Sequence, residues 1–183
     1  MSRGHAFTNP KEIKLKADLV MYEAGYLWLF RSDKIQVVYV EDLFDMKQTD
    51  IDAQIDSLAV TKITRSGTYK SGVLVGTRFY ITPDEVFESI FTFDIHDLVV
   101  TEIKTPKKMN SNLHFEGSKL WMVTDDVADQ VDDQHKMYTY DLTSKVCTSS
   151  TIPTKKQQDP FRIWSAGTSY VYTSNWTNFS CSY

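Results

Sequence analysis

Short runs in which apolar and polar residues alternate recur along the whole chain, whereas the period of an amphipathic helix is nearly absent. The first such runs are residues 19–22, 26–30, 35–40 and 58–64, and each has the length and alternation of a half-buried strand. Residues 43–58 are the one helical candidate, but Asp, Gln and Met residues dilute any apolar stripe there. The pattern therefore predicts an all-β fold.

A glycine that is followed at once by an aromatic-rich strand occurs four times. The glycines are Gly25, Gly76, Gly117 and Gly167, at spacings of 51, 41 and 50 residues. Repeats of roughly 40 to 50 residues are typical of propeller blades, which contain about four strands each. Joining the two ends of the chain gives a further spacing of 41 residues from Gly167 to Gly25. The repeat therefore predicts a small β-propeller.

Each unit also contains a strand of the pattern apolar, Thr or Ser, apolar. Its instances are residues 91–93, 138–140 and 179–181, with 38–40 in the same place of the first unit. Asp94 and Asp141 directly follow two of these strands. Because a residue that recurs at one place of each repeat serves the repeat itself, we interpret both as turn caps and not as an acid–base pair.

The predicted fold is a four-bladed β-propeller that forms a single domain over residues 1–183. The blades are assigned to residues 17–64, 69–105, 110–153 and 161–183, with residues 12–16 added to the last. The last unit lacks an outer strand, and residues 12–16 offer a spare one, so a shared blade closes the ring and removes its open edges. A fragment of a larger propeller and a β-sandwich are the alternatives.

The second and third units share an order of features. In the third unit these are residues 117–123, 137–142 and 152–153, and in the second unit 76–81, 91–95 and 104–106. This order resembles kelch-type propeller repeats. The paired glycines of that family are absent, and Val100-Thr101 and Cys147-Thr148 stand in place of its outer-strand tryptophan. The resemblance implies a propeller fold, and a fold by itself does not imply an activity.

Composition narrows the class of protein. Hydrophobic residues make up 42% and charged residues 24% of the chain, as in an ordinary soluble domain. Lys and Arg number 20 against 24 Asp and Glu, so the basic excess of most nucleic-acid binders is missing. No apolar run reaches the ~18 residues of a membrane helix, so we expect no membrane insertion. Residues 1–10 lack the apolar core of a signal peptide, which leaves secretion open because a mature start would lack one too. The sequence does not fix the compartment, and the cytoplasm is favoured over secretion or a virion.

The sequence offers no constellation for catalysis, a metal or a cofactor. The four histidines are His5, His96, His114 and His135. None of them forms a ligand pattern with another histidine or with either cysteine, and neither a Gly-x-Ser-x-Gly elbow nor a phosphate-binding glycine loop is present. The acidic segment 125–133 carries carboxylates but lacks the spacing and the glycine of a calcium loop. We therefore expect a protein that is not an enzyme and that uses no cofactor.

Two sets of loops share one face of the predicted propeller. The loops from an outer strand to the next blade are basic and include Lys107 and Lys108, whereas those between second and third strands are acidic. A face of mixed sign favours oriented docking of a protein over binding of nucleic acid. Trp176 and Phe87 are expected to be exposed anchors on this face. The candidate partner-binding residues are Trp176, Arg31, Arg65, Phe87, Asp125, Asp126, Lys155 and Lys156.

The remaining features support packing more than chemistry. Trp28, Tyr80 and Trp121 recur in the second strands, and we interpret them as packing between blades. The insertion at residues 44–56 is either a short helix or a surface loop.

The sequence thus favours a non-enzymatic binding or structural module that presents loops to a protein partner or a larger assembly. The alternative is a secreted or surface propeller that binds carbohydrate or another ligand, as lectins and hemopexin domains do. Its support is the glycosylation patterns at residues 175–177 and 178–180 and an aromatic content of 13%. An enzyme with a site at the mouth of the ring is the third possibility.

Overall fold

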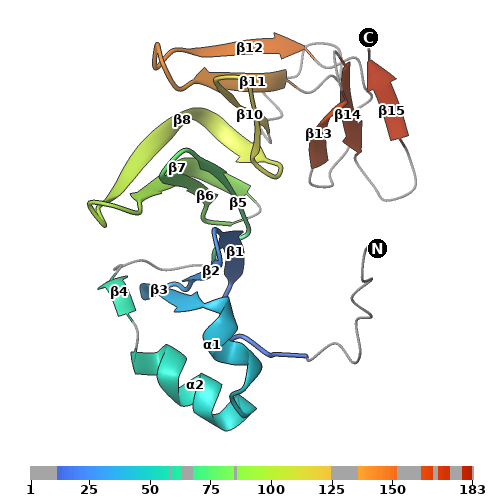
Figure 1. Ribbon diagram of the computed structural model, residues 1–183. Helices are drawn as coiled ribbons and strands as arrows, with labels where there is room; N and C mark the ends of the chain where they lie inside the picture. Colours follow the sequence, from blue (N-terminus) through green and yellow to red (C-terminus); the bar gives the residue numbers. More distant parts are fainter. Residues whose placement is uncertain are drawn as a thin grey trace, which may run out of the picture. The chain divides into compact units, whose positions relative to one another are not determined.

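The computed structural model describes residues 12–57, 59–62, 68–84, 86–124, 136–151, 162–166, 169–173 and 179–182 (Figure 1). The chain divides into two compact units, Met1–Thr64 and Arg65–Tyr183. Antiparallel sheets dominate both units, and every sheet is built from strands that follow one another in the chain. The prediction of an all-β fold is confirmed. The prediction of a single domain stays a prediction.

In the first unit, the described residues form one sheet of four strands in the order β1-β2-β3-β4, which we call the first sheet. Its strands are β1 (Leu19–Glu23), β2 (Tyr26–Phe30), β3 (Lys34–Tyr39) and β4 (Ala59–Lys62). A two-residue loop joins β1 to β2, with positive φ angles of 47° at Ala24 and 89° at Gly25. Positive φ at both loop residues is the pattern of a type I′ turn, whose twist matches that of the strands.

Two helices follow β3 and cover one face of the first sheet. They are α1 (Val40–Phe44) and α2 (Gln48–Ser57). Leu43 and Ile51 from these helices are fully buried and pack with Leu29 of β2. The insertion expected as a short helix or a loop is therefore helical, and it supplies apolar side chains to the core of the unit.

Residues 12–17 form an extended segment on the same core, and among the described residues this segment belongs to no sheet. The Gln48 side chain holds it, because the Lys14 N–H donates to Gln48 Oε1 at 3.0 Å and Gln48 Nε2 donates to the Lys14 carbonyl at 2.8 Å. Its half-buried apolar side chains are Ile13, Leu15 and Ala17. The strand predicted at residues 12–16 is thus not formed, because the helices offer these side chains an apolar surface that strand periodicity does not reveal.

The described residues of the second unit form three sheets. The second sheet consists of β5 (Ser71–Val75), β6 (Arg78–Thr82), β7 (Val86–Asp94) and β8 (Val100–Asn110). The third sheet consists of β9 (His114–Glu116), β10 (Lys119–Val123), β11 (Lys136–Asp141) and β12 (Cys147–Thr151). The fourth sheet has three strands in its described part, β13 (Arg162–Ala166), β14 (Ser169–Thr173) and β15 (Phe179–Ser182).

The recurring aromatic residues of the second strands occupy equivalent positions. Trp28, Tyr80 and Trp121 are each the third residue of their strands, β2, β6 and β10. The glycines are not equivalent, because Gly76 and Gly117 open their two-residue loops whereas Gly25 closes its own. The aromatic residues therefore identify the register of the repeat more accurately than the glycines do.

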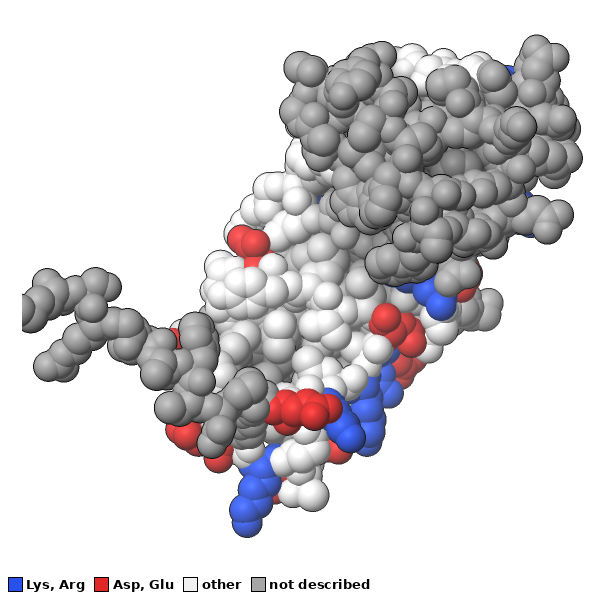
Figure 2. All heavy atoms as spheres, turned by 90° about the vertical axis from the view of Figure 1, so that its right-hand side faces the viewer, with Lys and Arg blue, Asp and Glu red and all other residues white. Residues whose placement is uncertain are grey.

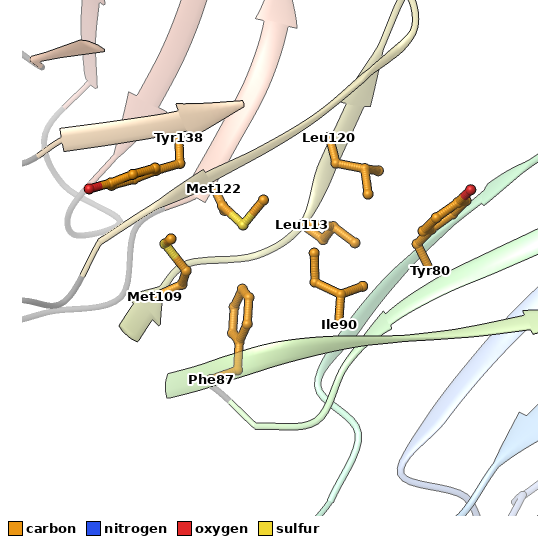
Figure 3. Close-up of a cluster of buried hydrophobic side chains, with 8 residues drawn as sticks. All are labelled: Tyr80, Phe87, Ile90, Met109, Leu113, Leu120, Met122 and Tyr138. Carbon is orange, nitrogen blue, oxygen red and sulfur yellow. The ribbon is translucent and has the colours of Figure 1, made fainter. Parts of the chain in front are cut away.

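The core of the second unit lies between the second and third sheets (Figure 3). Its buried members are Tyr80, Phe87, Ile90, Met109, Leu113, Leu120, Met122 and Tyr138. The side chains of Ile90 from the second sheet and Leu120 from the third sheet point into the same cluster, and both are fully buried. Tyr80 belongs to this cluster, so the prediction that it packs between sheets is confirmed.

The Thr residues of the third strands bond to the fourth strands. Thr92 of β7 faces Thr101 of β8, and Thr139 of β11 faces Thr148 of β12. Each pair is joined by a hydroxyl–hydroxyl hydrogen bond, at 2.7 Å in the second case. The sequence repeat that places Thr between apolar neighbours therefore serves a cross-strand bond near the outer edge of the second and third sheets.

Candidate partner-binding surface

Asp94 and Asp141, the recurring carboxylates, each tie two turns together at the end of a third strand. Asp94 Oδ1 accepts the His96 N–H at 3.0 Å, and Oδ2 accepts the Thr77 hydroxyl at 3.3 Å. Asp141 Oδ1 accepts the Ser144 N–H at 2.8 Å, and Oδ2 accepts the Ser118 hydroxyl at 3.0 Å. The interpretation of these carboxylates as turn caps is confirmed, because all of these donors belong to turns of their own sheets.

These hydrogen bonds change how the carboxylates titrate. The Ser144 N–H and then the Ser118 hydroxyl lower the pKa of Asp141 to about 2. The His96 N–H lowers the pKa of Asp94 in the same direction. Because a lowered folded-state pKa stabilises the fold above the unfolded value of about 3.9, this stabilisation is present at neutral pH. It is lost as the pH falls from about 4 through the folded-state pKa of about 2.

We therefore expect Asp141→Asn to lower the melting temperature at pH 7. We also expect the melting temperature of this variant to fall less steeply than that of the unchanged chain as the pH is lowered from about 4 to about 2. Thermal unfolding followed by circular dichroism across this range measures both effects. Asp18→Asn removes the same charge at an exposed position and serves as the control. A melting temperature of the Asp141 variant that declines as steeply as that of the unchanged chain would contradict the assignment.

A polar clasp of the hydroxyl groups of Ser71, Thr82 and Ser111 links the second and third sheets. Ser71 and Thr82 share a hydroxyl hydrogen bond at 2.8 Å, and Ser71 Oγ also accepts the Leu113 N–H at 3.0 Å. Ser111 Oγ accepts the Val123 N–H at 3.0 Å. Thr82 and Ser111 are buried, at 0% and 4% exposure. Together with the apolar core, these bonds fasten the two sheets into one rigid base.

In the second sheet, the pairing between β7 and β8 is interrupted for four residues of β8. Phe87 pairs with Met109 and Ser89 with Lys104, so Glu88 alone faces residues 105–108. We call residues 105–108 the basic bulge. Of these residues, Pro106, Lys107 and Lys108 are exposed. Figure 1 shows β8 as a long, bent strand. A proline without an N–H is accommodated where the ladder is interrupted.

The basic bulge is anchored at both ends. The Thr105 hydroxyl donates to the Lys107 carbonyl at 2.6 Å, which closes a tight local turn. The Thr124 hydroxyl, at 0% exposure, donates to the Lys108 carbonyl at 3.0 Å. Thr124, the residue after β10, also forms an isolated antiparallel β-bridge with Met109 of β8. The bulge therefore presents two lysines from a backbone that is bonded to the third sheet.

The structure places only two of the candidate partner-binding residues. Arg31 is partly exposed and lies 3.8 Å from Asp33 in an ion pair, and its role in binding stays a prediction. Phe87 is 2% exposed and packs in the core of the second unit. The expectation that Phe87 is an exposed anchor is thus wrong, because its side chain faces the third sheet.

The other candidates lie outside the described residues. They are Trp176, Arg65, Asp125, Asp126, Lys155 and Lys156. The glycosylation patterns at residues 175–177 and 178–180 are described only in part. The basic bulge itself was visible in the sequence as Lys107-Lys108, but not its interruption of the ladder, for which Pro106 is the only local signal.

The described residues contain no group of three or more His, Cys, Asp or Glu side chains placed to hold a metal ion.

Burial lowers the pKa of His114 on β9 and raises that of the Cys147 thiol on β12. A thiol whose pKa is raised is a poorer nucleophile at neutral pH. In the part of the chain that the structure describes, no helix is long and apolar enough to span a membrane.

Figure 2 shows charged side chains of both signs side by side in the lower part of the view, whereas most of the described surface above them is uncharged. The described residues of this face carry no continuous basic stripe. Mixed charge is suited to docking against a specific protein surface, whereas tracking of a phosphate backbone needs rows of cations.

Comparisons with known proteins identify a fold and no family. No family of sequences and no curated protein matches the chain. The structure of Hsv2 from Kluyveromyces lactis is similar, with a TM-score of 0.50 and 9% identity over 85% of this chain and 43% of that chain. The N-terminal domain of Nup159 is similar with a TM-score of 0.49 and 7% identity, over 84% of this chain and 38% of that chain.

Hsv2 and the N-terminal domain of Nup159 are β-propellers. The chain spans about two fifths of the length of these structures. The likeness to Hsv2, together with antiparallel sheets of four strands in chain order, shows a β-propeller type of fold. It supports the predicted propeller, and it does not identify the repeats as kelch-type.

Proposed function

We propose that this chain is a non-enzymatic protein-binding module that docks an acidic surface of its partner on the basic bulge. The observation that carries the proposal is the exposure of Lys107 and Lys108 on a backbone anchored to Thr124. A pre-organised backbone lowers the entropy lost on binding, and adjacent cations steer an acidic partner to the surface.

The other polar groups support this proposal by what they already do. Asp94, Asp141 and the hydroxyls of the polar clasp are bonded within the sheets, so these groups build the scaffold. Catalysis requires a base, acid or nucleophile placed beside a reacting atom, and these groups are placed beside turns and strands instead.

The Nup159 structures include one described as Dbp5 of S. cerevisiae bound to Nup159, Gle1, IP6 and ADP, in which proteins bind one another.

The test is a charge reversal of the basic bulge. Proteins retained from a cell extract by the immobilised chain are identified, and the association rate of each purified protein is measured at several salt concentrations. The variant Lys107→Glu/Lys108→Glu is expected to lower the association rate roughly tenfold or more at low salt, with a weaker effect at high salt.

The matched control is Lys47→Glu/Lys119→Glu, which changes the net charge equally at two other exposed lysines. The control is expected to retain the same proteins as the unchanged chain. Equal association rates for the bulge variant and the control would overturn the proposal.

We extend the proposal to the architecture: the four sheets are the blades of one propeller. The equivalent places of Trp28, Tyr80 and Trp121 and the repeated Asp turn caps support a common blade plan. Closure of four blades into a ring stays a prediction. Residues 12–16 are not supported as its closing strand, since Gln48 holds them on the first unit.

A further inference from the structure

The outer strand of the third sheet, β12, has an uncharged and exposed edge. Its residues are Cys147, Thr148, Ser149, Ser150 and Thr151, of which the last four are exposed. The sheet order is β12-β11-β10-β9, so among the described residues β12 pairs with β11 alone. An unpaired strand edge presents a row of N–H and C=O groups that another strand can bond.

The outward groups of β12 follow from the alternation of an antiparallel ladder. The Asp141 N–H donates to the Val146 carbonyl at 3.0 Å, so this opposed pair is a hydrogen-bonded one. Hydrogen-bonded and non-bonded pairs alternate from there, with Thr139–Thr148 bonded and Tyr138–Ser149 non-bonded. The backbone N–H and C=O of Ser149 therefore point away from β11, toward the open edge.

The outer strands of the first and second sheets are protected in ways that β12 is not. β8 carries the exposed pair Glu102 and Lys104, joined at 2.7 Å, and the basic bulge interrupts its edge. β4 is four residues long and ends in Lys62. Charges, proline, bulges and shortness all discourage strand addition. The sequence of β12 uses none of these devices, which marks its edge as available for pairing.

Two lysines near the ends of β12 indicate which kind of segment could pair with this edge. Lys145 precedes β12 at an exposed position with a positive φ of 62°, and Lys136 pairs with Thr151 at the other end. A neutral edge between two cations matches an extended segment with an uncharged core and acidic residues at both ends. A second copy of this chain fits less well, because antiparallel pairing of two β12 strands brings Lys145 of each copy toward Lys136 of the other.

We propose that β12 binds an extended segment of a protein partner by strand addition, and that the segment has an uncharged, β-branched core flanked by acidic residues. This inference rests on the proposed function and names a second surface for it. Main-chain hydrogen bonds to the outward groups of β12 supply affinity, and the flanking charges supply selectivity.

The test uses labelled synthetic peptides and fluorescence anisotropy on the full chain. The probe is Asp-Glu-Val-Thr-Val-Thr-Val-Glu-Asp, and its counterpart has Lys at the four flanking positions. Ser149→Pro removes one outward N–H without removing a bond to β11, and proline is tolerated at such edge positions. Ser149→Ala keeps the N–H and is the matched control.

We expect the acidic probe to bind the unchanged chain and Ser149→Ala equally, and to bind Ser149→Pro at least tenfold more weakly. The double reversal Lys136→Glu/Lys145→Glu is expected to transfer the preference to the lysine-flanked peptide, which keeps the test open if Ser149→Pro does not fold. Absence of binding by the acidic probe, or equal binding to Ser149→Pro, overturns the inference. Sedimentation tests whether a second copy of the chain occupies β12 instead. A dimer that Ser149→Pro abolishes and that the acidic probe does not dissociate would overturn the inference in favour of a second copy.

The two proposals fail separately. Loss of the β12 inference leaves the dependence of a retained protein on Lys107 and Lys108 unchanged. Loss of the basic bulge as a docking site leaves peptide binding at β12 unchanged, because Lys107 and Lys108 lie outside the third sheet.

Discussion

Truncation of Leu120 to alanine is expected to lower the free energy of unfolding of the second unit by about 2 to 5 kcal/mol. Leu120 is 0% exposed and lies in the core between the second and third sheets (Figure 3). The loss combines the apolar surface removed from the core with the cavity left behind, since the two sheets are fastened by the polar clasp and cannot close the gap fully. Urea denaturation followed by circular dichroism measures the change.

A double-mutant cycle with Ile90→Ala tests whether the two sheets unfold as one. Ile90 is also 0% exposed and faces the same cluster from the second sheet. If the sheets share one core, the two truncations are non-additive by about 0.5 kcal/mol or more. Val146→Ala, at an exposed position, should stay within about 0.5 kcal/mol of the unchanged chain. A Leu120 variant as stable as the Val146 variant would show that the two sheets do not pack as described.

The substitution Gly25→Ala carries the second large effect that we expect. Gly25 has a φ of 89°, and a Cβ atom built there lies 2.9 Å from Cε2 of the Tyr39 ring. The left-handed backbone costs a residue with a side chain about 1 to 2 kcal/mol, and the Tyr39 ring must move in addition. The ring is not free to move without loss, because it packs against Tyr26 with ring centroids 5.1 Å apart.

Gly76→Ala is the matched control for Gly25→Ala. Gly76 has a φ of 61°, and a Cβ atom there meets nothing within 4 Å. Both variants therefore suffer the backbone cost, and only the Gly25 variant suffers the contact. We expect a lower melting temperature for Gly25→Ala than for Gly76→Ala, measured on the full chain. Adding Tyr39→Leu to Gly25→Ala should recover part of the difference in melting temperature. If it recovers none, the contact with the Tyr39 ring is not the cause of the lower stability.

Some features of the candidate surface were accessible to sequence reasoning because they are local. Asp94 and Asp141 recur after strands of one pattern, and a short carboxylate that bonds the next N–H groups is sufficient to cap a turn. Lys107 and Lys108 were expected in a loop between blades; both are exposed as expected, but they lie within β8 (Val100–Asn110), so the loop assignment is wrong. Exposure of a charged pair beside a proline requires no knowledge of the distant chain.

Other features depend on what lies across the sheet. Phe87 follows a polar turn, which predicts exposure, yet the third sheet covers its side chain. The alternating residues 12–16 have the pattern of a strand, but an extended segment beside the buried Leu43 and Ile51 of the helices has the same pattern. The open edge of β12 follows from the order of the third sheet and from the phase of one hydrogen bond, Asp141 N–H to the Val146 carbonyl.

By itself, then, the sequence determined the all-β class, the repeated units and the turn-capping role of Asp94 and Asp141, because alternation, glycine loops and Asx turns act over a few residues. Only the tertiary structure decided which face of each strand is covered, where residues 12–17 pack, and which strand edge stays open. These outcomes depend on contacts between segments far apart in the chain, and the identical local pattern is compatible with burial, pairing or exposure.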